Sequence, residues 1–165
     1  MKKLSSILLG ILLILPMLCS CANKEEEFEE PVNFYYYNND VTYNSPTGVI
    51  CPEVREGVGY HGNLTAFLQS YLNGPKSDAV RSIIPSDVYL VSCELIDDEA
   101  QILFNKSFEK LSGIDLSTAC CALLLTVHDY TGANTIVIST KDGKIDDQDY
   151  MTLSIDDIVL IDQTM

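Results

Sequence analysis

Residues 64–75 read Leu-Thr-Ala-Phe-Leu-Gln-Ser-Tyr-Leu-Asn-Gly-Pro, and they are the best-delimited stretch of the sequence. Apolar residues recur at the spacing of a helix with one buried face, at positions 64, 67, 68, 71 and 72. Asn63 can cap the first turn, because a short side-chain oxygen accepts a hydrogen bond from a free backbone amide. Gly74 and Pro75 predict the end of the helix, since Gly tolerates the left-handed cap conformation and Pro cannot continue a helix.

Extended segments surround this predicted helix. The aromatic residues of 33–37 favour a first strand. Residues 49–55 form a second extended segment, in which Pro52 indicates an edge strand. Residues 88–105 are typical of a hairpin that turns at Asp97 and Asp98. Between these segments, residues 76–82 predict a polar connection with room for one helical turn.

A second helix is expected from near Ser117, with Asp115 or Ser117 as its cap, through Val127. It is apolar on nearly every side, so we expect it to be deeply buried. Residues 135–140 predict a further strand. The order of elements predicts an α+β fold, in which two helices pack on one face of a small, mostly antiparallel sheet.

The N-terminus is typical of a secreted bacterial lipoprotein. Lys2 and Lys3 precede an apolar run that is shorter than the roughly 20 residues of a membrane-spanning helix. Residues 18–21 read Leu-Cys-Ser-Cys, which resembles a lipoprotein cleavage site and predicts a signal peptide of residues 1–20 with lipidation at Cys21. Cys19 is the poorer acceptor because bulky Leu18 precedes it. An ordinary secretory signal cut nearby is the alternative.

An acidic segment separates the predicted anchor from the domain. Five of the six residues 25–30 are Glu, so residues 21–32 predict a solvated tether. Acyl chains contribute about 0.8 kcal/mol per buried methylene and need no basic patch to hold the chain at the cell membrane, on its extracytoplasmic face. The formal net charge of −14 argues against a nucleic-acid partner, because phosphates would be repelled.

The remaining cysteines are Cys51, Cys93, Cys120 and Cys121. None of their spacings resembles a zinc motif, and we expect mostly reduced, buried thiols. A Cys51–Cys93 disulfide is the alternative, since the predicted compartment lies outside the cytoplasm.

No catalytic, metal-binding or cofactor-binding residue is predicted. A Ser117, His128 and Asp129 relay would need a strained, exposed nucleophile, and the sequence has no such motif. His128 is better interpreted as a residue at the end of the second helix, and His61 as a loop residue. Residues 142–149 are acidic, but Gly143 does not fit the position that a calcium loop requires, so a solvated turn is expected.

The segment 64–75, followed by Ile-Ile-Pro-Ser-Asp-Val-Tyr-Leu at residues 83–90, resembles the GerMN domain family of sporulation and spore-germination proteins. The family pattern is a Leu-rich helix ending in Gly-Pro, an Ile-Pro entry to a strand, a hairpin ending near a Phe, here Phe108, an apolar helix and a last strand. The resemblance implies a domain over residues 33–145, similar to the ring-building motifs of secretion assemblies. Residues 146–165 would then be a C-terminal extension with at most one short strand, over 150–153 or 158–161.

The resemblance also implies a non-catalytic module that binds proteins or assembles at the membrane, in sporulation, germination or envelope regulation. Its partner would be an envelope protein or another copy of the chain. The contact surface would be an exposed sheet edge, such as the segment that contains Pro52, or the polar face of the first helix with Gln69 and Asn73. An envelope enzyme or a lipoprotein that binds a small ligand is the alternative.

Overall fold

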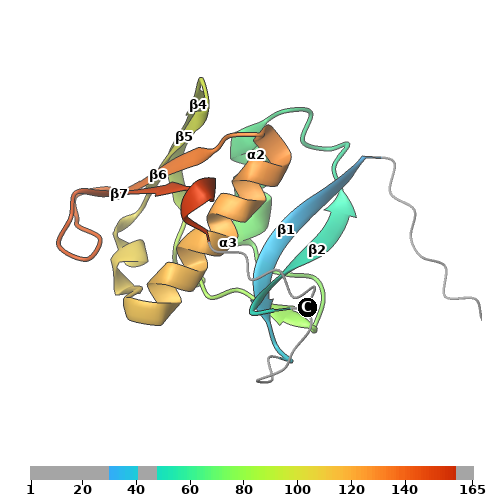
Figure 1. The fold of residues 1–165 in the computed structure, drawn as a ribbon, viewed down its shortest axis with the longest axis horizontal. Helices are drawn as coiled ribbons and strands as arrows, with labels where there is room; N and C mark the ends of the chain where they lie inside the picture. The colour runs from blue at the N-terminus through green and yellow to red at the C-terminus, as the bar shows by residue number, and fades with distance from the viewer. Residues whose placement is uncertain (1–29, 41–47, 159–165) are drawn as a thin grey trace, which may run out of the picture.

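The computed structural model describes residues 30–40 and 48–158, and it contains two sheets packed against a long central helix (Figure 1). The first sheet has the strand order β2-β1-β3. The second has the order β4-β5-β6-β7. The first-sheet strands are β1 (Pro31–Asn38), β2 (Ile50–Glu56) and β3 (Val80–Arg81). The second-sheet strands are β4 (Leu90–Ile96), β5 (Glu99–Phe104), β6 (Thr135–Thr140) and β7 (Tyr150–Ser154).

The helices are α2 (Leu64–Leu72) and α3 (Gly113–Thr131), with short 3-10 turns at Lys106–Lys110 and Ile155–Asp157. The predicted α+β class is confirmed, but the strands divide between two sheets instead of forming one. The predicted signal peptide, the predicted lipidation site Cys21, most of the predicted tether and all but the first residue of the strand considered at 158–161 lie outside the described residues. Within residues 30–40 and 48–158, no helix is both long and apolar enough to cross a membrane.

The predicted first helix is confirmed with both of its ends. The side chain of Asn63 accepts a hydrogen bond of 3.0 Å from the backbone amide of Ala66. Gly74 has φ of +85°, the left-handed conformation that ends the helix. The buried side chains of α2 are Leu64, Phe67, Leu68 and Tyr71, whereas Leu72 is half-buried.

The predicted start of the second helix, near Ser117, is wrong. Helix α3 begins at Gly113, and Ser117 bonds back to the Gly113 carbonyl at 3.1 Å instead of capping the helix. The first turn carries Ile114, which is exposed, so apolar periodicity did not reveal it. Gly132, with φ of +78°, ends the helix and donates to the His128 carbonyl. The predicted deep burial of the apolar residues of this helix is confirmed, since α3 contacts both β1 and β6.

The second sheet contains the predicted hairpin. Strands β4 and β5 pair antiparallel around Asp97, which has φ of +53°. Strand β4 begins at Leu90 and not at Val88, whose amide donates to the Pro85 carbonyl in a turn. Strand β6 lies parallel to β5, because α3 carries the chain back across the sheet. Strand β7 is the short strand expected near 150–153, and it pairs antiparallel with β6.

The first sheet has β1 at its centre, and β2 is an edge strand as Pro52 indicated. The prediction that residues 76–82 could hold one helical turn is wrong. Val80 and Arg81 instead form β3, pairing with Asn38 and Tyr37. Only the folded chain brings these distant segments together, so the local sequence could not predict this strand.

Helix α3 completes the hydrogen bonding at the free edge of β1. The buried hydroxyl of Thr126 accepts from the Tyr35 amide at 3.0 Å and donates to the Ala122 carbonyl at 2.8 Å. Phe34 and Tyr36 point from β1 into the core beside α2. The Tyr36 and Tyr71 rings stack with centroids 4.9 Å apart, so the first sheet and α2 share one aromatic core.

The four described cysteines are free thiols, as expected, and the alternative Cys51–Cys93 bridge is absent from the described residues. Burial raises the pKa of the Cys120 thiol to about 12 from its ordinary value of 9.0. Burial also raises the pKa of the Cys121 thiol. Since the thiolate is the reactive form, burial lowers the reactivity of both helix thiols in the folded protein.

We therefore expect N-ethylmaleimide at pH 8 to spare Cys120 in the folded protein and to modify it in urea. A rise of the thiol pKa from 9.0 to about 12 lowers the thiolate population about a thousandfold at this pH. Mass mapping would measure the modified fraction, with half-buried Cys93 as the control. Equal rates at both cysteines would contradict the burial of Cys120.

The same pKa shift makes the free energy of unfolding depend on pH. The contribution of the protonated Cys120 thiol is complete below pH 9 and is lost as pH rises toward 12.

Candidate interaction surfaces

The residues of the hypothetical hydrolase relay do not come together. The Ser117 hydroxyl donates to the Gly113 carbonyl, and His128 Nδ1 lies 3.0 Å from the Ala133 carbonyl oxygen. Asp129 instead accepts a hydrogen bond from the Asn33 amide at 3.0 Å. His128 lies in the last turn of α3, as interpreted from the sequence. His61 lies in a loop with φ of +45°.

The acidic loop after β6 is a turn held by its own backbone. Ile145 and Gln148 form an isolated bridge, and the Lys144 ammonium lies 3.7 Å from an Asp149 carboxylate oxygen. Asp146 and Asp147 both have positive φ. Within residues 30–40 and 48–158, no three His, Cys, Asp or Glu side chains group as potential ligands of one metal ion.

A buried ion pair on β2 was missed by the sequence analysis. Arg55 Nε donates to Glu53 at 2.5 Å, and both side chains are at least nine-tenths buried. The Arg55 guanidinium also donates to the Gly74 carbonyl at 2.8 Å and lies 4.6 Å from the Phe34 ring centroid. Glu53 accepts from the backbone amides of Lys76 and Ser77.

This pair fixes the segment that follows α2 against the first sheet. A cation near a helix C-terminus interacts favourably with the carbonyl ends of the helix. Burial raises the pKa of the nearby Tyr36 hydroxyl, which donates to the Tyr71 carbonyl. Glu53 and Arg55 are two residues apart, a spacing that places both on one face of β2. That spacing was the only sequence signal of the buried ion pair. It is a weak signal, because charged residues in a strand ordinarily face solvent.

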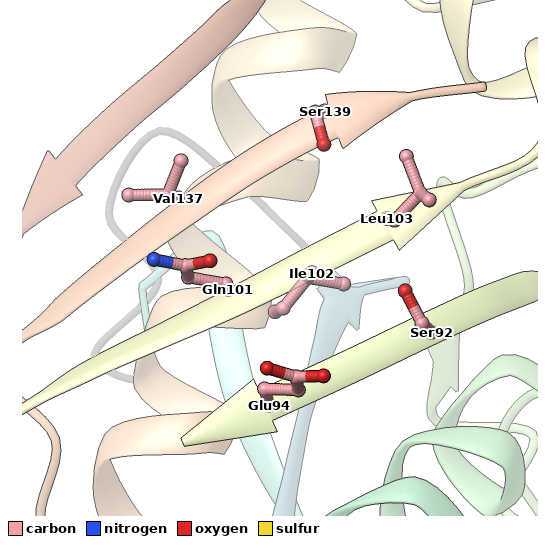
Figure 2. Close-up of a pocket in the computed structure, with 7 residues that line it drawn as sticks. All are labelled: Ser92, Glu94, Gln101, Ile102, Leu103, Val137 and Ser139. Carbon is pink, nitrogen blue, oxygen red and sulfur yellow. The ribbon is translucent and has the colours of Figure 1, made fainter. Parts of the chain in front are cut away.

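The second sheet has one covered face and one open face. Ala100, Ile102, Ile136 and Ile138 point toward the helices and are fully buried. The alternate residues point away, and we call this surface the outer face (Figure 2). On its three neighbouring strands β4, β5 and β6 it carries Ser92, Glu94, Gln101, Leu103, Val137 and Ser139.

The outer face is a shallow depression that mixes hydroxyl, amide and apolar groups. Ser92, Glu94 and Gln101 are exposed, whereas Leu103 and Val137 are half-buried. Such a composition suits contact with another protein surface, because the half-buried apolar side chains Leu103 and Val137 lie among polar groups that can pair across an interface. Burial alternates along β5 and β6, but the apolar residues Leu103 and Val137 interrupt the polar alternation in the sequence, so the sequence only partly indicated this face.

The sheet edges offer additional surfaces. On β2, Val54 is exposed at the edge that the sequence analysis singled out. On β4, Leu95 and Ile96 are exposed near the hairpin turn. The polar face of α2 is open as predicted, since Gln69 and Asn73 are exposed.

Two sheets packed on a central helix, with one open sheet face and exposed edges, define a small α+β domain with surfaces suited to protein contacts. The chain belongs to the Germane family, described as sporulation and spore germination, whose family model matches residues 33–146. This membership confirms the resemblance found in residues 64–90.

Solved structures show the same fold. The first GerMN domain of the sporulation protein GerM from Bacillus subtilis matches with a TM-score of 0.57 at 12% identity, over 73% of this chain and 91% of that one. The tandem GerMN domains of the same protein match with a TM-score of 0.51 at 22% identity, over 68% of this chain. The match covers 39% of the tandem structure. A search of curated proteins found no significant match.

Proposed function

We propose that the protein is a lipid-anchored, non-catalytic protein-binding module that acts in sporulation or spore germination. It is held by Cys21 at the extracytoplasmic face of the cell membrane, and its domain binds an envelope protein. The observation that carries the proposal is the open outer face of the second sheet, in a chain of the Germane family.

The anchor follows from the leader. A basic start, an apolar run and the Leu-Cys-Ser-Cys sequence favour lipidation of Cys21 over secretion as a soluble protein. Residues 22–29 then supply an acidic spacer that keeps the domain away from anionic lipid. Lipid attachment confines the module to a surface, where a weak protein contact gains from a raised effective concentration.

The non-catalytic role is supported by the hydrogen bonds that the candidate catalytic side chains already make within the domain. Asp129 and Ser117 are both hydrogen-bonded within the domain, to Asn33 and to the Gly113 carbonyl. The His128 ring lies against the Ala133 carbonyl. A binding module requires instead an accessible surface with both apolar and hydrogen-bonding groups, and the outer face carries both.

The anchor is tested by replacing Cys21 with alanine. Metabolic labelling with palmitate and separation of membranes should show loss of the label and release of the protein from the membrane fraction. Cys19→Ala is the matched control, because it removes a thiol two residues away and should leave both readouts unchanged. Labelling that depends on Cys19, or that persists in Cys21→Ala, would refute the assignment.

Binding through the outer face is tested by site-specific photocrosslinking in the intact, membrane-bound protein. A photoreactive residue at exposed Gln101 should capture a discrete envelope protein. The same residue at Asp78, which is exposed beside the first sheet, serves as the control and should capture none. Recovery of the monomer alone from Gln101, or equal capture from both positions, would count against the proposal.

A further inference from the structure

Helix α2 packs beside the edge strand β4, and a pocket opens between the two elements at one end. At the opposite end, Thr65 Oγ1 lies 3.2 Å from Cys93 Sγ. The pocket is lined by Gln69 and Leu72 of α2, by Val88 in the turn before β4 and by Leu90, the first residue of β4. We call the surface between these ends the α2–β4 groove. It is separate from the outer face, because Cys93 and Leu90 point to the opposite side of the sheet.

The strand beside this groove is the edge of its sheet, so one side of its backbone can accept another strand. Alternate residues of an edge strand direct their N–H and C=O groups away from the neighbouring strand. A bulge between Leu90 and Ser92 interrupts the pairing with β5, but residues 92–96 keep a regular register. The strand also exposes apolar side chains, with Val91 at 39%, Leu95 at 46% and Ile96 at 47%, and Tyr89 just before it is 62% exposed.

The edge strand β4 that borders the groove carries acidic residues on its outer side and at the hairpin turn, and no cation lies in the segments around it. Residues 56–75 and 82–105, which include α2 and the hairpin, contain no Lys or Arg. Asp87 pairs with Lys110 and Asp98 with Asn134, whereas Glu94 and Asp97 are exposed to solvent. Charge complementarity therefore favours a basic occupant. A second copy of the chain is disfavoured, since it carries the same acidic hairpin and a formal charge of −14.

We propose that the α2–β4 groove binds an extended segment of a partner protein in which apolar residues alternate with Lys or Arg. The segment adds as a strand to residues 92–96 of β4, a recognised mode of peptide binding. Because successive side chains of a strand point to opposite sides, one set lies on the side of Cys93 and Leu95, next to α2, and the other lies beside Glu94. Apolar side chains suit the first position and cations the second. This inference rests on the proposed protein-binding function and names the chemistry of the partner.

The test measures fluorescence anisotropy of a labelled peptide, acetyl-Lys-Leu-Lys-Val-Lys-Leu-Lys-amide, with the mature full-length protein. A peptide with Glu in place of every Lys is the matched probe. We expect saturable binding of the Lys peptide and none of the Glu peptide. Glu94→Lys should weaken binding about fivefold, since it removes one exposed ion pair. Gln69→Arg should weaken it about tenfold, because it places a like charge inside the groove.

Asp149→Lys is the control variant, because it makes the same charge change beside β7, at the opposite edge of the sheet. It should leave the affinity unchanged. Equal binding of both peptides, or equal losses in Glu94→Lys and Asp149→Lys, would overturn the groove assignment and indicate nonspecific charge attraction. An absence of binding to the Lys peptide would also overturn it. Glu94 also borders the outer face, whereas Gln69 lies on the α2 side only. Capture of a partner from Gln101 tests the outer face and Gln69→Arg tests the groove, so failure of one proposal can be told from failure of the other.

Discussion

Replacing Arg55 with methionine should lower the free energy of unfolding by about 3–5 kcal/mol. The substitution leaves the Glu53 carboxylate buried without its cation, while the amides of Lys76 and Ser77 still bond to it. It also removes the donor to the Gly74 carbonyl, which connects β2 to the end of α2. Urea unfolding followed by circular dichroism would measure the change.

Arg81→Met is the matched control for this substitution. Arg81 also lies over an aromatic ring, with its guanidinium 4.3 Å from the Tyr37 centroid, but it is exposed. Removal of the Arg81 guanidinium should lower the free energy of unfolding by about 1 kcal/mol or less. The double variant Glu53→Leu/Arg55→Met should recover part of the stability lost in Arg55→Met, because it removes the unpaired charge. Equal costs for Arg55→Met and Arg81→Met would refute the structural role of the buried pair.

Replacing Phe67 with alanine should lower the free energy of unfolding by about 3–5 kcal/mol, the range for truncating a buried aromatic side chain. Phe67 is fully buried on α2 and stacks on Phe34 and Tyr130, with ring centroids 4.6 Å and 3.8 Å away. The alanine variant leaves a cavity between β1, α2 and α3, because the rings on both sides belong to separate elements and cannot close it together. Thermal and urea unfolding would measure the loss.

Tyr89→Ala provides the comparison for Phe67→Ala. Tyr89 is an aromatic residue of similar size that is 62% exposed, so its truncation should change stability by no more than about 0.5 kcal/mol. An equal loss of stability in both variants would show that the stacked rings of Phe34, Phe67 and Tyr130 stabilise the fold no more than an exposed aromatic residue does.

Elements with strong local signals were predictable from the sequence. Helix α2 has a capping Asn, an apolar stripe and a Gly-Pro end within a single stretch, and each signal acts through neighbouring residues. The hairpin of β4 and β5 has alternating side chains around Asp97 and Asp98. The edge position of β2 followed from Pro52, since proline cannot donate to a sheet.

The candidate surfaces were only partly predictable. The open polar face of α2 and the exposed β2 edge were expected, and both are present. The outer face and the α2–β4 groove depend on which strands are neighbours and which of their faces a helix covers. Thr65 and Cys93 are 28 residues apart, so only the packing of α2 beside β4 places them at one end of the same groove.

Helix α2, the β4–β5 hairpin, the α+β class and the family could be read from the sequence, because capping, periodicity and turn residues act over a few positions. The tertiary structure alone decided that the strands divide between two sheets and that β3 exists as a two-residue pair with β1. It also decided that Arg55 is buried. The physical reason is that strand pairing and charge burial depend on partners distant in the chain, such as Gly74 for Arg55 and Tyr37 for Arg81.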